Sequence, residues 1–352
     1  MNQSYDALLV VSFGGPEGMT DVMPFLENVL RGKNVPPERM RAVAHHYEMF
    51  GGISPINEQN RRLIAALQKE LDADGPHLPI YWGNRNWHPL LADTLRQMAA
   101  DGVRRALAFV TSAYSSYSGC RQYREDIARA QAEVGANAPQ IDKLRAFYNH
   151  PSFIEPNVEN LRAALLHIPD ERRPSAQIAF TAHSIPLTMA DHCAYQAQLT
   201  EACRLVAGAV GHENWRLVFQ SRSGPAQQPW LEPDVCDYLR ALKEKGARDV
   251  VVHPIGFVSD HMEVIYDLDH EARALADELD LKLVRSATVG THSRFVGMIR
   301  ELILERMTQN PVRPFLGDCG PSHDVCPADC CLNMAARPPA TIANNTATTQ
   351  LP

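Results

Sequence analysis

The chain has 352 residues, too many for one ordinary hydrophobic core, and this length predicts two domains of about 150 residues each. Hydrophobic residues make up 45% of the chain and charged residues 21%, a composition that excludes disordered and collagenous proteins. The formal net charge of −7 argues against binding nucleic acid by phosphate neutralisation, and no apolar run approaches the roughly 20 residues of a membrane span.

The amino-terminal sequence predicts where the protein works. It lacks the basic region and small-residue cleavage site of a signal peptide, and its apolar run is typical of a strand. We therefore expect a cytoplasmic protein, in a compartment where cysteines seldom form disulfides. The chain nevertheless has eight cysteines, four of them within residues 319–331, and these four need an explanation other than disulfide bonds.

Short apolar runs alternate with amphipathic stretches along most of the chain. Runs typical of buried parallel strands occur at residues 7–12, 79–82, 105–110, 177–180, 215–220, 249–255 and 281–285. Patterns typical of helices occur at residues 20–30, 57–72, 88–100, 154–167, 232–244, 263–278 and 291–307. This alternation predicts an α/β fold in which helices cover both faces of parallel sheets.

Two stretches of the chain follow one pattern, which suggests duplication. Residues 101–112 and 245–256 each pass from a helix end through a glycine and a charged pair into a buried strand and a loop. We predict two similar α/β halves joined near residues 148–151, with a last helix able to pack back on the first half. The predicted division is a domain at 1–148, a second at 149–309 and a cysteine-containing tail at 310–352.

Candidate catalytic residues lie where predicted strands end, because ligands of open α/β sheets bind beyond the carboxyl ends of the strands. His183 directly follows a strand and could act as a base, or could simply bond a backbone carbonyl. Glu263 and Asp267 lie four residues apart and share a helix face, just after Asp260 and His261. These carboxylates could equally cap the helix. No glycine-rich nucleotide-binding motif is present.

The tail cysteines suggest a metal centre. Thiolates this dense suit zinc or an iron–sulfur cluster, although regular CxxC pairs are missing. Cys120, in a loop after a strand, is the natural partner from the body of the protein. The tail candidates are Cys319, Cys326, Cys330 and Cys331, whereas Cys193, Cys203 and Cys236 lie in helical patterns and are interpreted as bystanders.

From Tyr5 to Gln309 the sequence resembles the ferrochelatase family. The segments that carry the resemblance occur in the family's order and are Ser12–Pro16, Gly51–Ile56, Gly83–Pro89, Ala182–Pro186, Ser223–Pro225 with Pro229–Leu231, and Pro254–Phe257 with Ser259–Glu263. The sequences of residues 50–56, 83–87 and 112–120 are most similar to those of the actinobacterial branch.

The resemblance implies a fold and an activity. The implied fold is a pair of flavodoxin-like (Rossmann-like) parallel-sheet domains with the active-site cleft between them. The implied activity is insertion of Fe(II) into coproporphyrin III to form coproheme in haem biosynthesis. We expect a monomer and, from the charge and composition above, no nucleic-acid partner and no membrane span. The alternatives are insertion into protoporphyrin IX, cobalt chelation, a tetrapyrrole-binding protein without turnover and a cluster-based sensor.

The resemblance also implies roles for individual residues. His183 and Glu263 are the expected catalytic residues: His183 would abstract protons or handle iron, and Glu263 would deliver metal and release protons together with Asp267 and Asp260. The expected porphyrin-binding residues are Ser54, Arg85, Tyr47, Tyr117, Phe13 and Trp230, with Arg31, Lys33 and Ser115 as further candidates for the propionates. Phe13 stands where firmicute members carry a tyrosine that can ligate iron, so axial ligation from that side is not expected. His46 stands where those members carry a propionate-binding arginine, so propionate binding must differ here, and His46 itself could partly substitute.

A [2Fe-2S] cluster is the cofactor that the resemblance implies. Its ligands would be Cys120, Cys319 and Cys326, with Cys331 or Cys330 as the fourth. If Cys319 is free, both of the adjacent cysteines could bind instead. The implied role of the cluster is stability or sensing.

Overall fold

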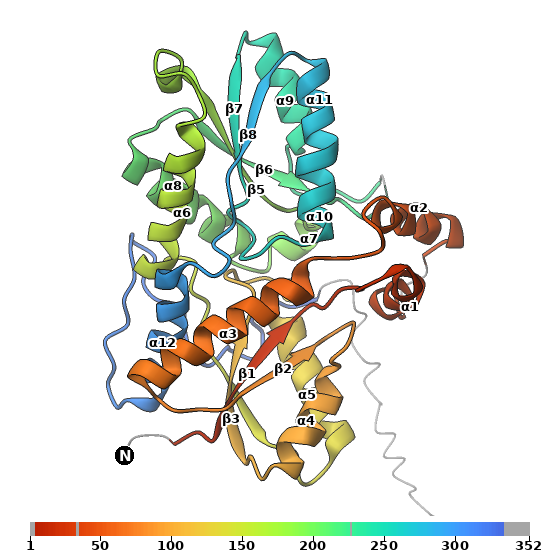
Figure 1. Ribbon diagram of the computed structural model, residues 1–352, viewed down its shortest axis with the longest axis vertical. Coiled ribbons are helices and arrows are strands. Elements are labelled where there is room, and N and C mark those ends of the chain that lie inside the picture. Colours follow the sequence, from red (N-terminus) through yellow and green to blue (C-terminus); the bar gives the residue numbers. More distant parts are fainter. Residues whose placement is uncertain (1–3, 33–34, 226, 334–352) are drawn as a thin grey trace, which may run out of the picture.

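The computed structural model describes residues 4–32, 35–225 and 227–333 and contains two parallel four-stranded sheets (Figure 1). The first sheet has the order β2-β1-β3-β4 and comprises β1 (Ala7–Ser12), β2 (Ile80–Asn84), β3 (Arg105–Val110) and β4 (Gln140–Lys143). The second has the equivalent order β6-β5-β7-β8 and comprises β5 (Gln177–His183), β6 (Trp215–Gln220), β7 (Asp249–His253) and β8 (Lys282–Arg285). The equivalent orders confirm the prediction of two similar α/β halves.

Helices connect the strands in both halves. The first half contains α1 (Met19–Val29), α2 (Pro37–Glu48), α3 (Ile56–Asp74), α4 (Leu91–Ala100), the π-helix η1 (Tyr117–Arg121) and α5 (Gln122–Val134). The second contains α6 (Pro151–Leu165), the 3₁₀-helix η2 (Arg173–Ser175), α7 (Leu187–Ala190), α8 (Tyr195–Val210), α9 (Val235–Glu244), α10 (Met262–Val264), the π-helix η3 (Ile265–Ala272), α11 (Arg273–Glu278) and α12 (Ser293–Met307).

Alternate residues of each strand face different helix layers, as the pleat of a strand requires. In the first sheet, Leu9 and Val11 pack with α4 and α5, whereas Leu8 and Val10 pack with α3 and α12. The second sheet is likewise buried on both faces, between α6 and α8 on one side and α9 and α11 on the other. Burial of both faces explains why the strand sequences are almost continuously apolar.

The helices α2, α5 and α8 and the strand β4 lie outside the predicted ranges, whereas the predicted elements differ from the observed ones mainly at their ends. β7 stops at His253, because Pro254 follows and has no N–H to donate. α9 begins only after Asp234, whose side chain accepts a hydrogen bond from the backbone N–H of Cys236 at 2.8 Å. The predicted helix at 263–278 is a continuous helical stretch with π-helical η3 in its middle, a distortion often found at functional sites.

The last helix joins the two halves. α12 lies beside α3 of the first half and α6 of the second (Figure 1). Its Phe295 is completely buried, with ring centroids 6.3 Å from Phe109, 5.9 Å from Phe147 and 6.2 Å from Phe153. One apolar core therefore continues from the first sheet through α12 into the second half. The exact domain boundaries at residues 148 and 309 stay a prediction.

The carboxyl ends of the two sheets face each other. The Tyr114 hydroxyl, beyond β3, donates a hydrogen bond to the carbonyl of Ile255, beyond β7, at 2.9 Å. The backbone N–H of Asp260 donates to Gln59 Oε1 of α3 at 2.8 Å. These contacts bring the loops after the strands of both halves to one region, where the predicted catalytic residues lie.

The residues after α12 are fastened to the first half. The Arg145 guanidinium forms a buried ion pair with Glu305 at 2.7 Å and donates to the carbonyl of Pro314 at 3.0 Å. Asn149 Nδ2 donates to the carbonyls of Leu316 at 3.2 Å and Gly320 at 2.9 Å. The first part of the predicted tail is therefore a packed segment, and residues 334–352 lie outside the described structure.

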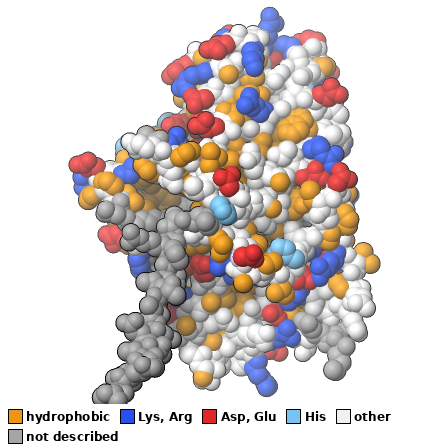
Figure 2. All heavy atoms as spheres, turned by 180° about the vertical axis from the view of Figure 1, so that it is seen from behind, with side chains coloured by type: hydrophobic (Ala, Val, Ile, Leu, Met, Phe, Trp, Pro, Cys, Tyr) orange, Lys and Arg blue, Asp and Glu red, His pale blue; other side chains and the backbone are white. Residues whose placement is uncertain are grey.

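The character of the helices and the distribution of surface charge are the last two features of the fold. None of the helices in the described part of the chain has the length and apolar character needed to cross a membrane. Acidic and basic side chains are interspersed over the face shown in Figure 2.

We predict that Phe295→Ala lowers the free energy of unfolding by about 3–5 kcal/mol, because it leaves a cavity in the core that both halves share. The matched control is Phe315→Ala, since that ring is 44% exposed, and its effect should be within about 0.5 kcal/mol. Chemical denaturation followed by circular dichroism measures both. Equal effects of the two substitutions would contradict this account of α12.

Candidate functional site

His183 is the last residue of β5, at the edge that faces the first half. The carbonyl of Ser184 lies against its Nδ1 and accepts the proton there, which leaves Nε2 of the neutral ring with a free lone pair. Nε2 is 3.7 Å from Glu263 Oε2, and about a third of the His183 side chain is exposed. The imidazole can therefore accept a proton or bind a metal ion from the open side.

Glu263 stands between two histidines. Its Oε2 is 3.9 Å from Nδ1 of His261 in addition to its contact with His183. The His261 ring packs edge-on against Phe257 at 5.0 Å, and burial lowers its pKa while Glu263 opposes the shift. A mainly neutral His261 beside an exposed carboxylate gives this site a second nitrogen donor.

Asp267 lies one turn further along the same helix. Its Oδ2 accepts hydrogen bonds from the hydroxyl of Ser221 and from Gln220 Nε2, the latter at 3.3 Å. Loss of hydration raises the pKa of Asp267 to about 7, and the charges of Glu263 and Glu271 add to this shift. A carboxyl group that titrates near neutral pH is suited to receiving and releasing protons.

Asp260 has a different environment. Both of its carboxylate oxygens accept hydrogen bonds from Arg285, at 3.0 and 3.2 Å, and Arg285 also pairs with Asp269 at 2.7 Å. The charge of Asp260 is thus balanced by a neighbour, unlike that of Glu263. Its predicted role in metal delivery stays a prediction, and in this structure it fixes the loop that leads into α10.

Aromatic residues of the first half form the surface opposite Glu263. Tyr47 is buried beside Phe25 and Met262, and burial raises its pKa far above the usual range, with a contribution from Glu263. Phe13 is 37% exposed and packs edge-on against Phe25, with ring centroids 6.2 Å apart. Phe13 therefore presents part of an aromatic ring at the rim of the site.

His46 reaches from α2 to the π-helix of the second half. Its ring stacks on Tyr266 with centroids 3.7 Å apart and an interplanar angle of 8°. Burial, together with the nearby charges of His45, Arg39 and His270, lowers the pKa of His46. The stacked pair is a direct contact between α2 and η3 next to the predicted active site.

Several predicted porphyrin-binding residues already form ion pairs or hydrogen bonds with other side chains of the protein. Arg85 forms a buried ion pair with Asp126 and lies over the ring of Tyr123 at 4.5 Å. The Tyr117 hydroxyl donates to Glu125 at 3.0 Å. Arg85 also lies 5.8 Å from the Phe13 ring, so these two do come together. Binding of propionate by Arg85 stays a prediction that requires it to share its charge with Asp126.

The remaining predicted porphyrin contacts are scattered. Ser54 is buried beneath the loop at Gly15, and Trp230 is buried with its Nε1 lacking a hydrogen-bond partner among the described residues. The backbone N–H of Ser115 donates to Gln198 at 2.7 Å, and Arg31 donates to Asn28. Lys33 lies outside the described residues.

Four of the five predicted cluster cysteines come together. The thiols of Cys120 and Cys326 form a hydrogen bond that raises the pKa of Cys120 and, with the charges of Lys143 and Arg124, lowers the pKa of Cys326 to about 4. Cys330 Sγ lies 3.5 Å from Cys331 Sγ. The hydrogen bond from Cys120 therefore favours the thiolate form of Cys326, which is the form that binds metals.

Cys319 lies apart from this group, on the surface. Cys319 forms a hydrogen bond with Tyr148. Burial and the charge of Cys319 raise the pKa of Tyr148 to about 12. Cys193, interpreted from the sequence as a bystander, lies close enough to add to the raised pKa of Cys331 after burial and Cys330.

The family model named ferrochelatase matches residues 5–307. The chain belongs to the ferrochelatase family. It is 59% identical over 336 residues to a protein of Rhodopirellula baltica named ferrochelatase, with 95% of each chain covered. It is 51% identical over 363 residues to the coproporphyrin III ferrochelatase of Streptomyces griseus, with 97% of each chain covered.

A solved structure supports the fold of this ferrochelatase. SirB from Bacillus subtilis with Fe3+ superposes with a TM-score of 0.50 at 12% identity, over 85% of this chain and 96% of that one. At this level of identity the similarity concerns the arrangement of the two α/β halves, which agrees with the fold class predicted from the sequence.

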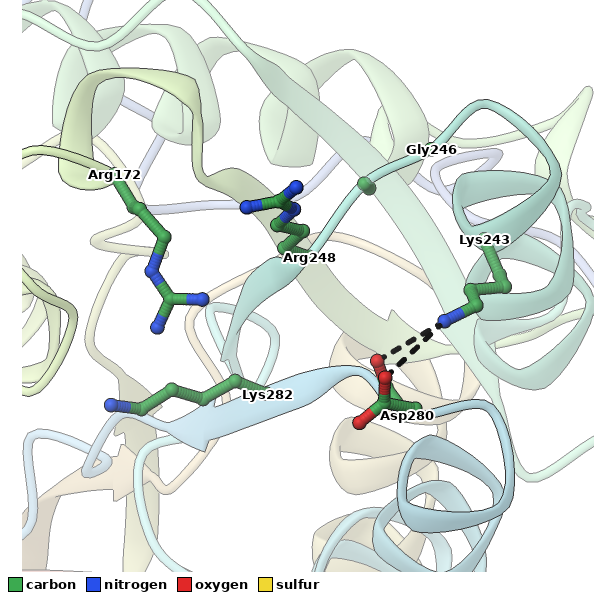
Figure 3. A pocket seen from close by; sticks show the side chains of 7 residues that line it. Arg172, Lys243, Gly246, Arg248, Asp280 and Lys282 are labelled. Carbon is green, nitrogen blue, oxygen red and sulfur yellow. Dashed lines mark hydrogen bonds and ion pairs between the residues drawn. The ribbon is translucent and has the colours of Figure 1, made fainter.

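A basic pocket of about 430 Å³ lies away from the predicted active site, at the amino ends of β7 and β8 (Figure 3). Arg172, Arg248 and Lys282 line it, and Lys243 pairs with Asp280 at its edge. None of the predicted catalytic residues lies there. The pocket therefore does not change the assignment of the active site to the carboxyl ends of the strands.

Sequence reasoning missed three residues of the site. The sequence-based prediction gives no role to His261, Gln220 or Ser221. The signal for all three was available, because Gln220 ends a strand, Ser221 directly follows it and His261 lies two residues before Glu263. Their contacts with Glu263 and Asp267 required the structure.

We predict that Asp267→Asn changes how stability depends on pH. A carboxyl whose pKa rises from 3.8 to about 7 on folding stabilises the protein below pH 4, and that contribution is lost as the pH rises through 7. The free energy of unfolding of the unmodified protein should therefore fall relative to Asp267→Asn between pH 4 and 8, on the order of a few kcal/mol. If urea denaturation gave the same pH dependence of the free energy of unfolding for both proteins, Asp267 would not have a raised pKa.

Proposed function

We propose that this ferrochelatase inserts Fe(II) into coproporphyrin III to form coproheme. The observation that carries the proposal is the pair of His183 Nε2 and Glu263 Oε2, 3.7 Å apart, both in the second half at the end that faces the first. Relatives from Streptomyces griseus and Streptomyces coelicolor, 51% and 52% identical over nearly the whole chain, are named coproporphyrin III ferrochelatases. Their names are the ground for choosing coproporphyrin III over protoporphyrin IX.

The residues of the site match what metal insertion requires. The macrocycle must lose its pyrrole N–H protons, and the incoming ferrous ion must give up water before the nitrogens bind it. His183 Nε2 can take a proton or hold the iron, because neutral imidazole is both a base near neutral pH and a good ligand for divalent iron. Glu263 can stabilise the protonated imidazole or the approaching cation.

Released protons have a short path through carboxyl groups. Glu263 and Asp267 occupy consecutive turns, and Glu271 follows one turn later, close enough to raise the pKa of Asp267. With a pKa of about 7, Asp267 can accept a proton from the Glu263 side and release it. Hydrogen bonds from Gln220 and Ser221 hold the Asp267 carboxylate in place.

Exposed aromatic surface can receive the flat ligand. Phe13 presents its ring at the rim, and His46 stacked on Tyr266 closes the neighbouring side. Propionates need charged or hydroxyl partners. Arg85, which pairs with Asp126, lies 5.8 Å from the Phe13 ring and is therefore a candidate partner for a propionate.

We predict that His183→Ala lowers the rate of Fe(II) insertion by about 10²–10⁴-fold, the usual contribution of a positioned acid–base group. The control is His167→Ala, since His167 is an exposed residue after α6. The assay follows metalloporphyrin formation by absorbance under anaerobic conditions. Activity of His183→Ala equal to that of His167→Ala would remove His183 from the mechanism.

We further propose that a [2Fe-2S] cluster binds at the cysteines beside α5. The donor set fits a thiolate-bound cluster, because Cys120, Cys326 and Cys331 interact with one another and Cys330 adjoins them. The Arg121 guanidinium donates to the carbonyls of Ala328 at 2.7 Å and Cys330 at 2.9 Å, which holds the loop against the first half. When bound, the cluster would link the segment after α12 to the body of the protein.

Replacement of Cys326 tests the cluster. Cys326→Ser should abolish the visible absorption and the iron and acid-labile sulfide of the anaerobically purified protein. Cys236→Ser is a matched control, because Cys236 is a half-buried cysteine of the second half. Unchanged iron and sulfide in Cys326→Ser would contradict the proposed ligand set. The cytoplasmic location and the monomeric state remain predictions, of which size-exclusion chromatography with light scattering tests the second.

A further inference from the structure

The basic pocket of Figure 3 is part of a longer hollow on the second half. A neighbouring cavity of about 390 Å³ shares Arg172, Gly246, Ala247 and Arg248 with it, so the two cavities adjoin. The chain as a whole is acidic, with a formal net charge of −7. A hollow whose charged side chains are mostly cationic is therefore a local exception that needs an explanation.

Two of the cations in this hollow are explained by the fold. Lys243 and Lys245 lie at the carboxyl end of α9, where positive charges stabilise the helix dipole. Lys243 also donates a hydrogen bond to the carbonyl of Asp280 at 3.2 Å. These two lysines need no ligand to account for them.

Three other cations come from separate elements and converge on the pocket. Arg172 precedes η2, Arg248 precedes β7 and Lys282 begins β8, and Figure 3 shows the ends of their side chains turned toward one space. The buried carboxylate of Asp249 holds Arg172 there, with Nη2 of the arginine 3.3 Å from Oδ1. Within the part of the chain that the structure describes, neither Arg248 nor Lys282 forms an ion pair. The converging groups therefore carry an excess of two positive charges, whose mutual repulsion disfavours the arrangement unless an anion binds.

The first half shows the equivalent position without this excess. In the register of the two sheets, Arg105 and Gln140 correspond to Asp249 and Lys282. Arg105 pairs with Asp142 at 2.6 Å, and Gln140 carries no charge. The cationic excess is therefore a property of the second half and not of the duplicated fold.

We propose that this pocket binds the phosphate group of a small molecule, either a phosphate monoester or free phosphate. A phosphate dianion matches the excess of two positive charges, and guanidinium groups can each donate two parallel hydrogen bonds to its oxygens. The adjoining cavity, which Ser175 and Gln177 help to line, can take the rest of a phosphorylated molecule. Because the cations converge on one pocket instead of spreading over a face, a single small ligand fits better than a membrane surface.

The pocket is separate from the proposed site of metal insertion. It lies at the amino ends of β7 and β8, whereas His183 and Glu263 lie at the carboxyl ends of the strands of the same sheet. Phosphate binding therefore does not depend on the proposed function, and either proposal can fail without the other.

Equilibrium dialysis of the full chain tests the proposal, at low ionic strength so that the cations are not screened. The radiolabelled probes are inorganic phosphate, adenosine monophosphate and, as the probe without phosphate, adenosine. Each is offered to the unmodified protein, Arg248→Gln, Lys282→Gln and Arg104→Gln. Arg104→Gln is the matched control, because Arg104 is exposed and precedes β3 as Arg248 precedes β7.

We expect both phosphate probes to bind at one site per chain, and adenosine not to bind. Arg248→Gln and Lys282→Gln should each weaken phosphate binding about tenfold or more, the usual effect of losing a charged hydrogen bond, whereas Arg104→Gln should leave it unchanged. Tighter binding of adenosine monophosphate than of inorganic phosphate would identify the ligand as a phosphate monoester, and the reverse order as free phosphate. The replaced side chains are exposed, so the variants should fold normally, which circular dichroism checks.

Three results would overturn the proposal. The first is no binding of either phosphate probe at millimolar concentration. The second is equal weakening by Arg248→Gln and Arg104→Gln, because binding would then depend only on total charge. The third is sedimentation of the protein with phosphatidylglycerol vesicles, lost in Arg248→Gln, without binding of either soluble phosphate, which would make the pocket part of a membrane-binding surface.

Discussion

The packing of α12 across both halves is the constraint on which the site depends. Two parallel sheets each gather their loops at one edge, but a site forms between them only if those edges are held face to face. The buried Phe295 and the ion pair of Arg145 with Glu305 fasten the last helix to the first half, while the same helix packs on α6 of the second. This shared core allows Met262 to pack on α1 and α2 and brings Glu263 close to Tyr47 of the first half.

The electrostatics of the site follow from where each carboxylate lies. Asp260 is balanced by Arg285, Glu263 lies in solvent between two histidines, and Asp267 is partly withdrawn from water. Three carboxylates on one stretch of chain therefore have three different environments, and loss of hydration raises the pKa of Asp267. The π-helix η3 contributes to this arrangement, because it carries both Asp267 and Tyr266, and the ring of Tyr266 stacks on His46.

The sequence predicted the strands well because parallel strands buried on both faces must be apolar. β4 was not predicted, because it is an edge strand whose sequence, Gln-Ile-Asp-Lys, lacks the apolar run of a buried strand. The pairing of Arg85 with Asp126 could not be seen either, since those residues come together only when β2 lies next to the start of α5. Motifs predict His183, Glu263 and the cysteines as candidate reactive residues, but spacing alone could not show that the loop turns His323 toward Cys326 and Cys319 toward Tyr148.

The central claim is that the facing edges of the two halves hold a site for metal insertion. Its most direct test is the absorption spectrum of the purified protein under anaerobic conditions, after addition of coproporphyrin III or protoporphyrin IX and then of Fe(II). The account predicts enzyme-dependent conversion of the free-base spectrum to that of the iron porphyrin over many turnovers, faster with coproporphyrin III. Tight porphyrin binding with an unchanged free-base spectrum after Fe(II) is added would contradict it.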